Sequence, residues 1–473
     1  MIELNLVSIL ILLPILGTVF VFLSANSTLC KSTALWNSAI TLILSFTLLT
    51  MFNFSKNTIQ YIDEYNWLPN YGIKYKVGLD KFSLPFICMI SLICFLTKLW
   101  ILKKKIHKTK YFLAAILLFE SFSIGAFCSY DLFLLLVFLE STTIPIIIMI
   151  FSSEKNYSKN AVMQFLMYGM LSTICITIAF VSIYNSCGTA DLLQIYKHKH
   201  LLGPIPFWLL IVGIAVKIPI FPLYYWLPEV HVQSPTTCSV LLGSIALKFS
   251  SLILLRILFP VFYDQIMQYT KEISVLCVIS MVLSCSNIFM QDDLKKIFAY
   301  FSILHMNMCM LIFLSGIGLR YFVFSLLSHS FVLAMLFFST DAIHTVLQTR
   351  SIVDLKKNSP QLVLIKNIMF SNILILIGVP LTSGFMVDIV SVYASYKLSA
   401  IYATILVFII LALSTYLFFT YQSIFNQLKN KTDTKLEIPV GHLQINSISK
   451  KMVFVTISTC ILFLGIFSSK VLM

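Results

Sequence analysis

Apolar runs long enough to cross a lipid bilayer recur along almost the whole sequence. About 20 helical residues span roughly 30 Å of hydrocarbon, and about fourteen runs approach that length. Hydrophobic residues make up 59% of the 473 residues and charged residues only 11%, which excludes an ordinary soluble globular protein. The sequence therefore predicts an all-α polytopic membrane protein. The runs are 5–25, 34–54, 83–102, 111–129, 131–151, 161–184, 205–226, 236–259, 273–291, 297–315, 320–344, 366–395, 399–424 and 451–471.

The positive charge is concentrated in the short polar breaks between these runs. The net charge is +14, which would suggest a nucleic-acid partner in a soluble domain. Here the lysines cluster in loops such as 103–110. Such clusters are typical of the loops that face the negatively charged compartment, the matrix or the cytoplasm. We therefore expect contact with membrane lipids and no nucleic acid. The loops after odd-numbered runs carry more Lys and Arg, which predicts that both termini lie on the opposite side.

The segments outside the apolar runs offer no place for a catalytic domain. The longest, 55–82 and 425–450, are too short to fold into one. The eleven cysteines contain no CxxC pair, so we predict neither a disulfide framework nor a metal or cluster site. No nucleotide-binding loop, nucleophile triad or haem motif is present. We therefore expect no cofactor and no metal in this chain, and chemistry confined to the bilayer.

The stretch from Gly213 to Lys248 carries two lysines in otherwise apolar runs. A lysine at the centre of a membrane helix costs roughly 2.5–3.5 kcal/mol, so it usually faces a polar interior and has a function. Pro219 and Pro222 lie between Lys217 and Lys248 and remove backbone donors, which predicts that helix seven breaks within the membrane. A broken helix beside a buried charge is typical of an ion pathway.

A second interrupted run suggests an internal repeat. Run twelve contains Gly378, Pro380 and Gly384 just before Asp388. Interrupted helices seven and twelve, five runs apart, are typical of transporters built from two inverted five-helix repeats. The predicted divisions are 1–110 for helices one to three, 111–259 and 260–424 for the two repeats, and 425–473 for a loop and helix fourteen.

Six ionisable residues on different runs fall at a similar depth in the membrane, and we expect them to form a row parallel to its plane. They are Glu140, Lys217, Lys248, His305, His329 and Asp388. A lysine close to a carboxylate holds its proton tightly, whereas one without that partner in an apolar site loses it more easily. Changes in the separation of such a pair therefore move a proton, and the row would relay protons through intervening water.

For each of these residues a purely structural role is the alternative. The acids and lysines could form structural ion pairs, and a neutral histidine with satisfied hydrogen bonds is a common core residue. Glu120 is expected to face a neighbouring helix. Lys98, Arg256 and His344 lie near the ends of their runs, which favours side chains that reach toward the interface.

Seven segments resemble the antiporter-like membrane subunits of respiratory complex I, in the same order along the chain. They are VGLDKFSLPF (77–86), FCSYDLFLLLVFLESTTIPIIIMI (127–150), AVMQFLMYGMLST (161–173), AVKIPIFPLYYWLPEVHVQSPTTCSVLLGSIALK (215–248), QDDLKKIFAYFSILHMN (291–307), LLSHSFVLAMLF (326–337) and GVPLTSGFMVD (378–388). The resemblance implies fourteen transmembrane helices and proton translocation coupled to quinone reduction elsewhere in the complex. NAD, FMN, iron–sulfur clusters and ubiquinone would be bound by other subunits, and the partners would include neighbouring antiporter-like chains.

The resemblance also implies a role for each residue of the row. Glu140 and Lys217 match the family's coupled acid–lysine pair, and Lys248 matches the central relay lysine. The remaining three match the connecting histidines and the terminal acid: His305, His329 and Asp388. Within the family, one type of chain has an acid at the terminal position and another typically has a lysine. Asp388 therefore resembles the type with the acid.

The sequence departs from the family at this terminal position. The family usually has glutamate after glycine, whereas Asp388 follows Val387 and its side chain is one methylene shorter.

Two other functions remain open: a subunit of a multisubunit sodium/proton antiporter, and a scaffold that pumps nothing. The abundance of Phe, Ile, Asn, Lys and Tyr is typical of an A+T-rich organellar gene. Together with this composition, the resemblance implies a protein of the mitochondrial inner membrane.

Overall fold

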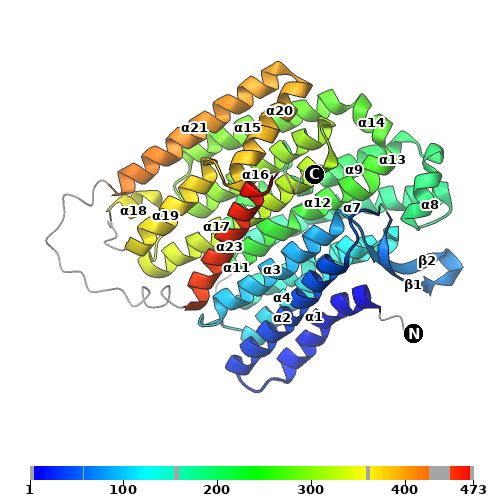
Figure 1. The fold of residues 1–473 in the computed structure, drawn as a ribbon, viewed down its shortest axis with the longest axis horizontal. Helices are drawn as coiled ribbons and strands as arrows, with labels where there is room; N and C mark the ends of the chain where they lie inside the picture. The colour runs from blue at the N-terminus through cyan, green and yellow to red at the C-terminus, as the bar shows by residue number, and fades with distance from the viewer. Residues whose placement is uncertain (1–4, 57, 154–158, 358–362, 426–447, 469–473) are drawn as a thin grey trace. The chain divides into compact units, whose positions relative to one another are not determined.

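The computed structural model describes residues 5–56, 58–153, 159–357, 363–425 and 448–468 (Figure 1). In these residues twelve helices are long and apolar enough to cross a membrane, and two shorter apolar helices cover Pro204–Lys217 and Asn367–Leu376. This confirms a polytopic helical membrane protein, and the two shorter helices lie in the predicted runs seven and twelve. Most of the predicted loop 425–450 lies outside the described residues.

The chain divides into two compact units. Unit 1 contains Met1–Ile218 and Ile245–Gln268, and unit 2 contains Pro219–Ser244 and Tyr269–Met473. The four repeat divisions predicted from the sequence remain a prediction. The elements of unit 1 are α1 (Leu6–Leu23), α2 (Ser27–Met51), β1 (Gln60–Leu68), η1 (Pro69–Tyr71), β2 (Ile73–Leu79), α3 (Ser83–Ile101), α4 (Thr109–Cys128), α5 (Leu132–Ser141), α6 (Thr143–Ser153), α7 (Lys159–Cys187), α8 (Leu192–Lys197), η2 (Lys199–Leu201), α9 (Pro204–Lys217), α12 (Lys248–Ile253), η4 (Leu254–Leu258), α13 (Phe259–Val261) and α14 (Tyr263–Gln268).

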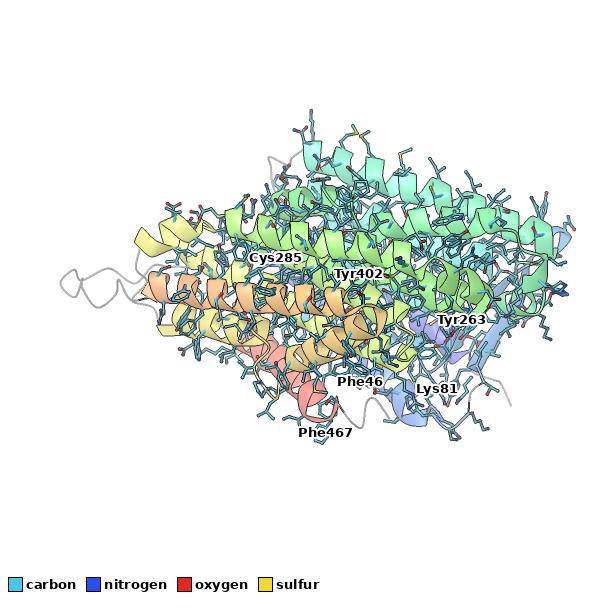
Figure 2. All side chains as sticks on the ribbon, turned by 90° about the horizontal axis from the view of Figure 1, so that it is seen from above. Phe46, Lys81, Tyr263, Cys285, Tyr402 and Phe467 are labelled. Carbon is cyan, nitrogen blue, oxygen red and sulfur yellow. The ribbon has the colours of Figure 1, made fainter. Side chains whose placement is uncertain are left out.

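Unit 2 is entirely helical in the residues that are described. Its elements are α10 (Trp226–Gln233), α11 (Thr236–Leu241), α15 (Thr270–Met290), α16 (Leu294–Leu314), α17 (Leu319–Leu347), α18 (Ile352–Lys357), α19 (Val363–Leu376), α20 (Ser383–Leu398), α21 (Ala400–Phe425) and α23 (Ile448–Ile466). Helix α21 packs along α15, where the rings of Phe289 and Tyr416 meet edge to face with centroids 5.0 Å apart. Figure 2 shows these two helices side by side, with Cys285 on α15 and Tyr402 on α21 labelled.

The hairpin β1–β2 was not predicted, and it adds a two-stranded sheet to an otherwise helical fold. The two strands pair antiparallel through a turn in which Gly72 adopts φ 63°, a conformation that glycine accepts without strain. Lys74 and Glu64 lie on facing strands, with 2.6 Å between Nζ and Oε1. Apolar and polar residues alternate from Ile73 to Val77, which is typical of a strand, but apolar length alone does not predict it.

In the part of the chain that the structure describes, helices break at the two places that the sequence predicted and also within the run 131–151. Helix α9 ends at Lys217 and the next helix begins at Trp226; α19 ends at Leu376 and α20 begins at Ser383. The third break separates α5 from α6 at Thr142. Pro145 explains it, because proline cannot donate to the carbonyl of residue 141 and clashes with that turn.

Candidate functional site

Glu140 and Lys217 lie together in unit 1. Glu140 is close to the end of α5, and Lys217 is the last residue of α9, where the helix stops before Pro219. The Lys217 ammonium is 3.6 Å from Glu140 Oε1, while the Thr173 hydroxyl on α7 donates to Oε2 at 2.5 Å. Both members of this predicted pair therefore lie at helix breaks, where a small backbone movement changes the distance between the charges.

The residues after the predicted break belong to unit 2 and are held by side chains of the same unit. The N–H of Phe221 donates to the Ser280 hydroxyl on α15 at 2.7 Å. The Asn307 amide on α16 donates to the carbonyl of Pro219 at 3.2 Å. Backbone groups released by the prolines are thus satisfied by hydrogen bonds, which is what an interrupted helix needs inside a membrane.

Lys248 is completely buried in unit 1. It is the first residue of α12 and follows the π-helical turn η3 (Leu242–Ala246); a second π-helical turn is η4. A π-turn adds a residue to the helix and rotates the side chains that follow it, and such turns are frequent at functional sites. Lys248 is therefore an interior lysine beside an irregular helical turn, and its relay role stays a prediction.

His305 and His329 lie beside each other in unit 2. Their rings, on α16 and α17, are nearly parallel with centroids 6.0 Å apart, and both side chains are buried. The Ser302 hydroxyl lies 3.4 Å from His329 Nε2. The Ser328 hydroxyl, on α17, donates to Ser383 at the start of α20 at 2.8 Å. The structure therefore connects the two predicted histidines and ties their helices to the helix that carries Asp388.

Asp388 reaches back toward the break before its own helix. A Cβ built on Gly378 would collide with Asp388 Oδ2, so the carboxylate occupies the space that a side chain at 378 would fill. Gly378 has φ 68°, a conformation suited to glycine. The predicted residues thus form two pairs, Glu140–Lys217 and His305–His329, together with Lys248 and Asp388. A continuous row through all six stays a prediction.

A buried ion pair between Lys98 and Glu120 was not predicted. Lys98 Nζ on α3 lies 2.6 Å from Glu120 Oε2 on α4, with 1% and 0% of the side chains exposed. The Ser38 hydroxyl on α2 also donates to Oε2, at 2.8 Å. Glu120 does face its neighbouring helices, but the expectation that Lys98 reaches the interface was wrong. Its long side chain turns toward a buried carboxylate because that neutralises both charges.

Arg256 is also buried, contrary to the expectation of interfacial anchoring. Its guanidinium donates to the carbonyls of Phe127 and Ser129 at the end of α4, and its carbon Cζ lies 4.0 Å from the centre of the Tyr130 ring. One nitrogen is 3.3 Å from Asp80 Oδ2. These contacts join the end of α4 to the segment before α3, so Arg256 holds the end of the bundle together.

The electrostatics of Asp80 follow from this arrangement. Burial acts to raise the pKa of its carboxyl group. The positive charge of Arg256 and hydrogen bonds from Tyr130 and Ser83 outweigh burial, so the pKa lies below its usual range. Asp80 is therefore the charged partner of Arg256 over the physiological pH range.

His231 is a further buried group that the sequence analysis did not select. Its ring stacks on Phe337 in unit 2 with centroids 4.7 Å apart and 15° between the planes. Among the described residues, neither ring nitrogen has a hydrogen-bond partner. His231 lies in α10, directly after the predicted break, and this position is the signal in the sequence that could have selected it. The described residues also contain no cluster of three His, Cys, Asp or Glu side chains that could hold a metal ion.

Helix breaks beside ionisable side chains within membrane helices are typical of ion-translocating membrane proteins. Residues 129–419 match the family described as "NADH:quinone oxidoreductase/Mrp antiporter, TM". The chain belongs to this family, which confirms the resemblance drawn from its motifs.

Similar proteins have comparable length and the same fold. NADH-quinone oxidoreductase subunit M of Rickettsia prowazekii is 30% identical over 90% of this chain and 89% of its own length. NADH-ubiquinone oxidoreductase chain 4 of Marchantia polymorpha is 33% identical over 72% of this chain and 70% of its own. A chain of respiratory complex I from Thermus thermophilus shares the fold with a TM-score of 0.83 at 21% identity, covering 98% of this chain and 96% of that one. A chain of the Mrp complex from Dietzia gives 0.82 at 17% identity, over 100% and 96%.

Proposed function

We propose that this chain is a proton-translocating core membrane subunit of NADH:ubiquinone oxidoreductase, of the chain 4 type. The observation that carries the proposal is the Glu140–Lys217 pair, placed where α5 and α9 end. The names of the relatives support the assignment to this enzyme. As a subunit of the enzyme, the chain would contribute the proton path while other subunits bind NAD, FMN, iron–sulfur clusters and ubiquinone.

In this function the chain moves protons through groups that it supplies itself. At 3.6 Å the Lys217 ammonium and the Glu140 carboxylate attract each other, and a longer separation weakens that attraction. A proton released from Lys217 would pass by way of Lys248 to the histidine pair. His305 and His329 can each accept and donate a proton, and Asp388 would exchange it at the far end.

The proposed setting is the mitochondrial inner membrane, with both termini on the intermembrane-space side. The relatives named chain 4, the composition of the sequence and the distribution of lysines among its loops support this placement. The partners would be the other membrane-arm subunits, including neighbouring antiporter-like chains, and lipids.

A sodium/proton antiporter subunit is the second candidate, because a chain of an Mrp complex has the same fold. Purification of the assembly from its native membrane separates the two. Co-purification of flavin and iron–sulfur subunits, with NADH-driven proton uptake that Lys217→Met abolishes, supports the proposal. Purification without redox subunits, with sodium-dependent proton exchange, would establish the antiporter instead. Normal pumping by both Lys217→Met and Glu140→Gln in an intact assembly would leave a scaffold role.

A further inference from the structure

Arg256 is a buried cation that the proposed proton path does not use. It lies in the π-helical turn η4, in the same membrane-crossing segment as Lys248, and only 4% of the residue is exposed. The two residues are eight positions apart, which is about 12 Å along a helix, and residues at this spacing share one helix face. Lys248 and Arg256 are therefore successive positive groups along one side of α12 and η4.

Buried polar groups continue between these two residues. Ser251 lies one turn after Lys248, and its buried hydroxyl has no hydrogen-bond partner among the described residues. The same is true of Nε of Arg256. Buried polar groups are nearly always satisfied by protein or by ordered water, so this helix face suits water molecules between Lys248 and Arg256. Because water relays protons, such a face needs a closure at its end.

Arg256 lies at the end of unit 1 where α1 begins. The hairpin identifies this end, because Asp63 on β1 accepts hydrogen bonds from the N–H and the hydroxyl of Ser8 in α1. Strand β2 then leads into Asp80, and Oδ2 of Asp80 is 3.3 Å from the guanidinium of Arg256. The arginine therefore stands between Lys248 and this end of the helices.

Arg256 and Asp80 both keep their charges. An arginine stays protonated in proteins, so it cannot pass a proton on. Burial acts to raise the pKa of Asp80, but Arg256 and hydrogen bonds from Tyr130 and Ser83 hold this pKa below its usual range. The guanidinium also donates to two backbone carbonyls at the end of α4 and lies over the Tyr130 ring, which fix its position. A fixed cation repels a proton that approaches from Lys248.

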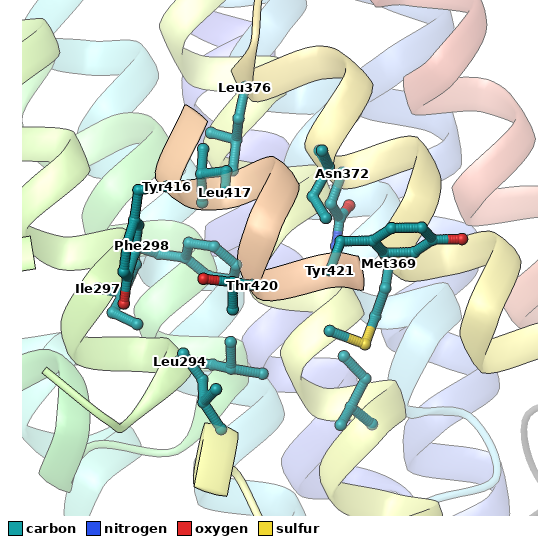
Figure 3. Close-up of a pocket in the computed structure, with 13 residues that line it drawn as sticks. Leu294, Ile297, Phe298, Met369, Asn372, Leu376, Tyr416, Leu417, Thr420 and Tyr421 are labelled. Atoms are coloured by element: carbon teal, nitrogen blue, oxygen red, sulfur yellow. The ribbon is translucent and has the colours of Figure 1, made fainter. Parts of the chain in front are cut away.

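A buried arginine is a costly way to close a helix end. An ion pair inside a protein is often no more stabilising than apolar residues of similar volume. In unit 2, α16, α19 and α21 close around a narrow space with apolar side chains, among them Phe298, Met369 and Leu417 (Figure 3). The space reaches a helix end, because its lining includes Leu294, the first residue of α16. The fold can thus close such an end without a charge, which favours a function for Arg256 beyond packing.

We propose that Arg256, held by Asp80 and Tyr130, is an electrostatic seal that stops a proton on Lys248 from leaving through this end of unit 1. The inference deepens the proposed function and rests on it, because it concerns the same proton path. Since both termini are proposed to lie on the intermembrane-space side, the seal would face that space. A proton on Lys248 would then continue to the histidine pair rather than escape along η4.

The test measures passive proton flux, without NADH, through the full assembly in sealed vesicles that contain a fluorescent pH indicator. Arg256→Gln/Asp80→Asn removes both charges, leaves no unpaired ion and keeps hydrogen-bonding groups at both positions. After an imposed pH step, its flux should be about tenfold higher than that of the unmodified assembly, which corresponds to about 1.4 kcal/mol lost from the barrier. Lys248→Met in the same background should abolish the increase.

Two variants separate the charge from general effects of substitution. The matched control is Lys98→Met/Glu120→Gln, which neutralises another buried ion pair of unit 1 and should leave passive flux unchanged. Arg256→Lys keeps the positive charge beside Asp80 and should also keep the flux low.

Unchanged passive flux in the Arg256→Gln/Asp80→Asn assembly would overturn the seal. An equal increase in Arg256→Lys or in the control would do the same, as would an increase that persists with Lys248→Met. If the double variant does not assemble, Asp80→Asn decides, because it keeps the arginine and weakens only the helix end: low flux supports the seal and raised flux contradicts it. Failure of the proposed function shows separately, as normal NADH-driven pumping by Lys217→Met.

Discussion

Lys98 Nζ lies 2.6 Å from Glu120 Oε2, and both side chains are almost completely removed from solvent. The pair joins α3 to α4, and the Ser38 hydroxyl connects it to α2. Removal of one member of such a pair leaves an uncompensated charge in an apolar interior, whereas removal of both does not. A structural ion pair is therefore recognised when the single variant is less stable than the double variant. The pair formed by Glu140 and Lys217 differs in position, because it lies at helix breaks.

Lys98→Met should therefore destabilise the N-terminal helices by about 3–5 kcal/mol, because Glu120 loses its counter-charge. The double variant Lys98→Met/Glu120→Gln should recover most of that loss. The measurement is the fraction of detergent-solubilised protein that stays folded after stepwise heating. Equal losses in the single and double variants would mean that the pair contributes through packing rather than charge.

Lys217→Met and Glu140→Gln should each lower proton translocation by about a hundredfold or more, as expected for loss of a proton-transferring group. Assembly should be unchanged, because the two side chains are only partly buried and their ammonium–carboxylate distance is 3.6 Å. Proton uptake by reconstituted vesicles, with assembly checked on native gels, measures both effects. Thr173→Val, which removes the hydrogen bond to Glu140, should cause a smaller loss. Wild-type pumping by both charge variants would remove the pair from the proton path.

Lys248→Ala should stop or uncouple turnover while the assembly remains intact, because Lys248 is the predicted relay between the acid–lysine pair and the histidines. NADH oxidation and proton uptake are measured in the same vesicles. Loss of both shows that turnover has stopped, whereas NADH oxidation without proton uptake shows that it is uncoupled. Coupled activity at the normal rate in this variant would exclude Lys248 from the relay.

Gly378→Ala should destabilise the break between α19 and α20 by about 1–3 kcal/mol, because the new methyl group meets the Asp388 carboxylate at a backbone conformation that alanine disfavours. Gly169→Ala in α7 is the matched control. It has no neighbouring atom within 4 Å of the added Cβ and should be neutral or slightly stabilising. Thermal unfolding compares the two. An equal effect at both positions would show that Asp388 moves away without cost.

The stability of the helix ends around Arg256 should depend on pH through Asp80. The folded protein holds the pKa of Asp80 below its usual range, so the carboxylate contributes stability above the pKa of the unfolded chain. That contribution is lost as pH falls through the lower folded-state pKa. Asp80→Asn should lower the melting temperature at pH 7, and its difference from the unmodified chain should shrink in acid. A difference that is constant with pH would show that the Asp80 charge does not stabilise the fold.

Apolar length and proline placement allowed the sequence to predict the membrane helices and the breaks at Pro219 and Pro380. These features are local, because a helix must satisfy its backbone within the bilayer and proline interrupts that pattern wherever it occurs. The seven sequence motifs were also sufficient to identify the family.

Only the tertiary structure decided which charges are partners. Position within a run placed Lys98 and Arg256 near the interface, yet both turn inward toward Glu120 and Asp80. The sequence likewise selected His305 and His329 separately, while helix packing brought their rings together. Depth along one helix is a property of that helix alone, whereas the partner of a buried charge depends on which neighbouring helix presents an opposite charge at the same level.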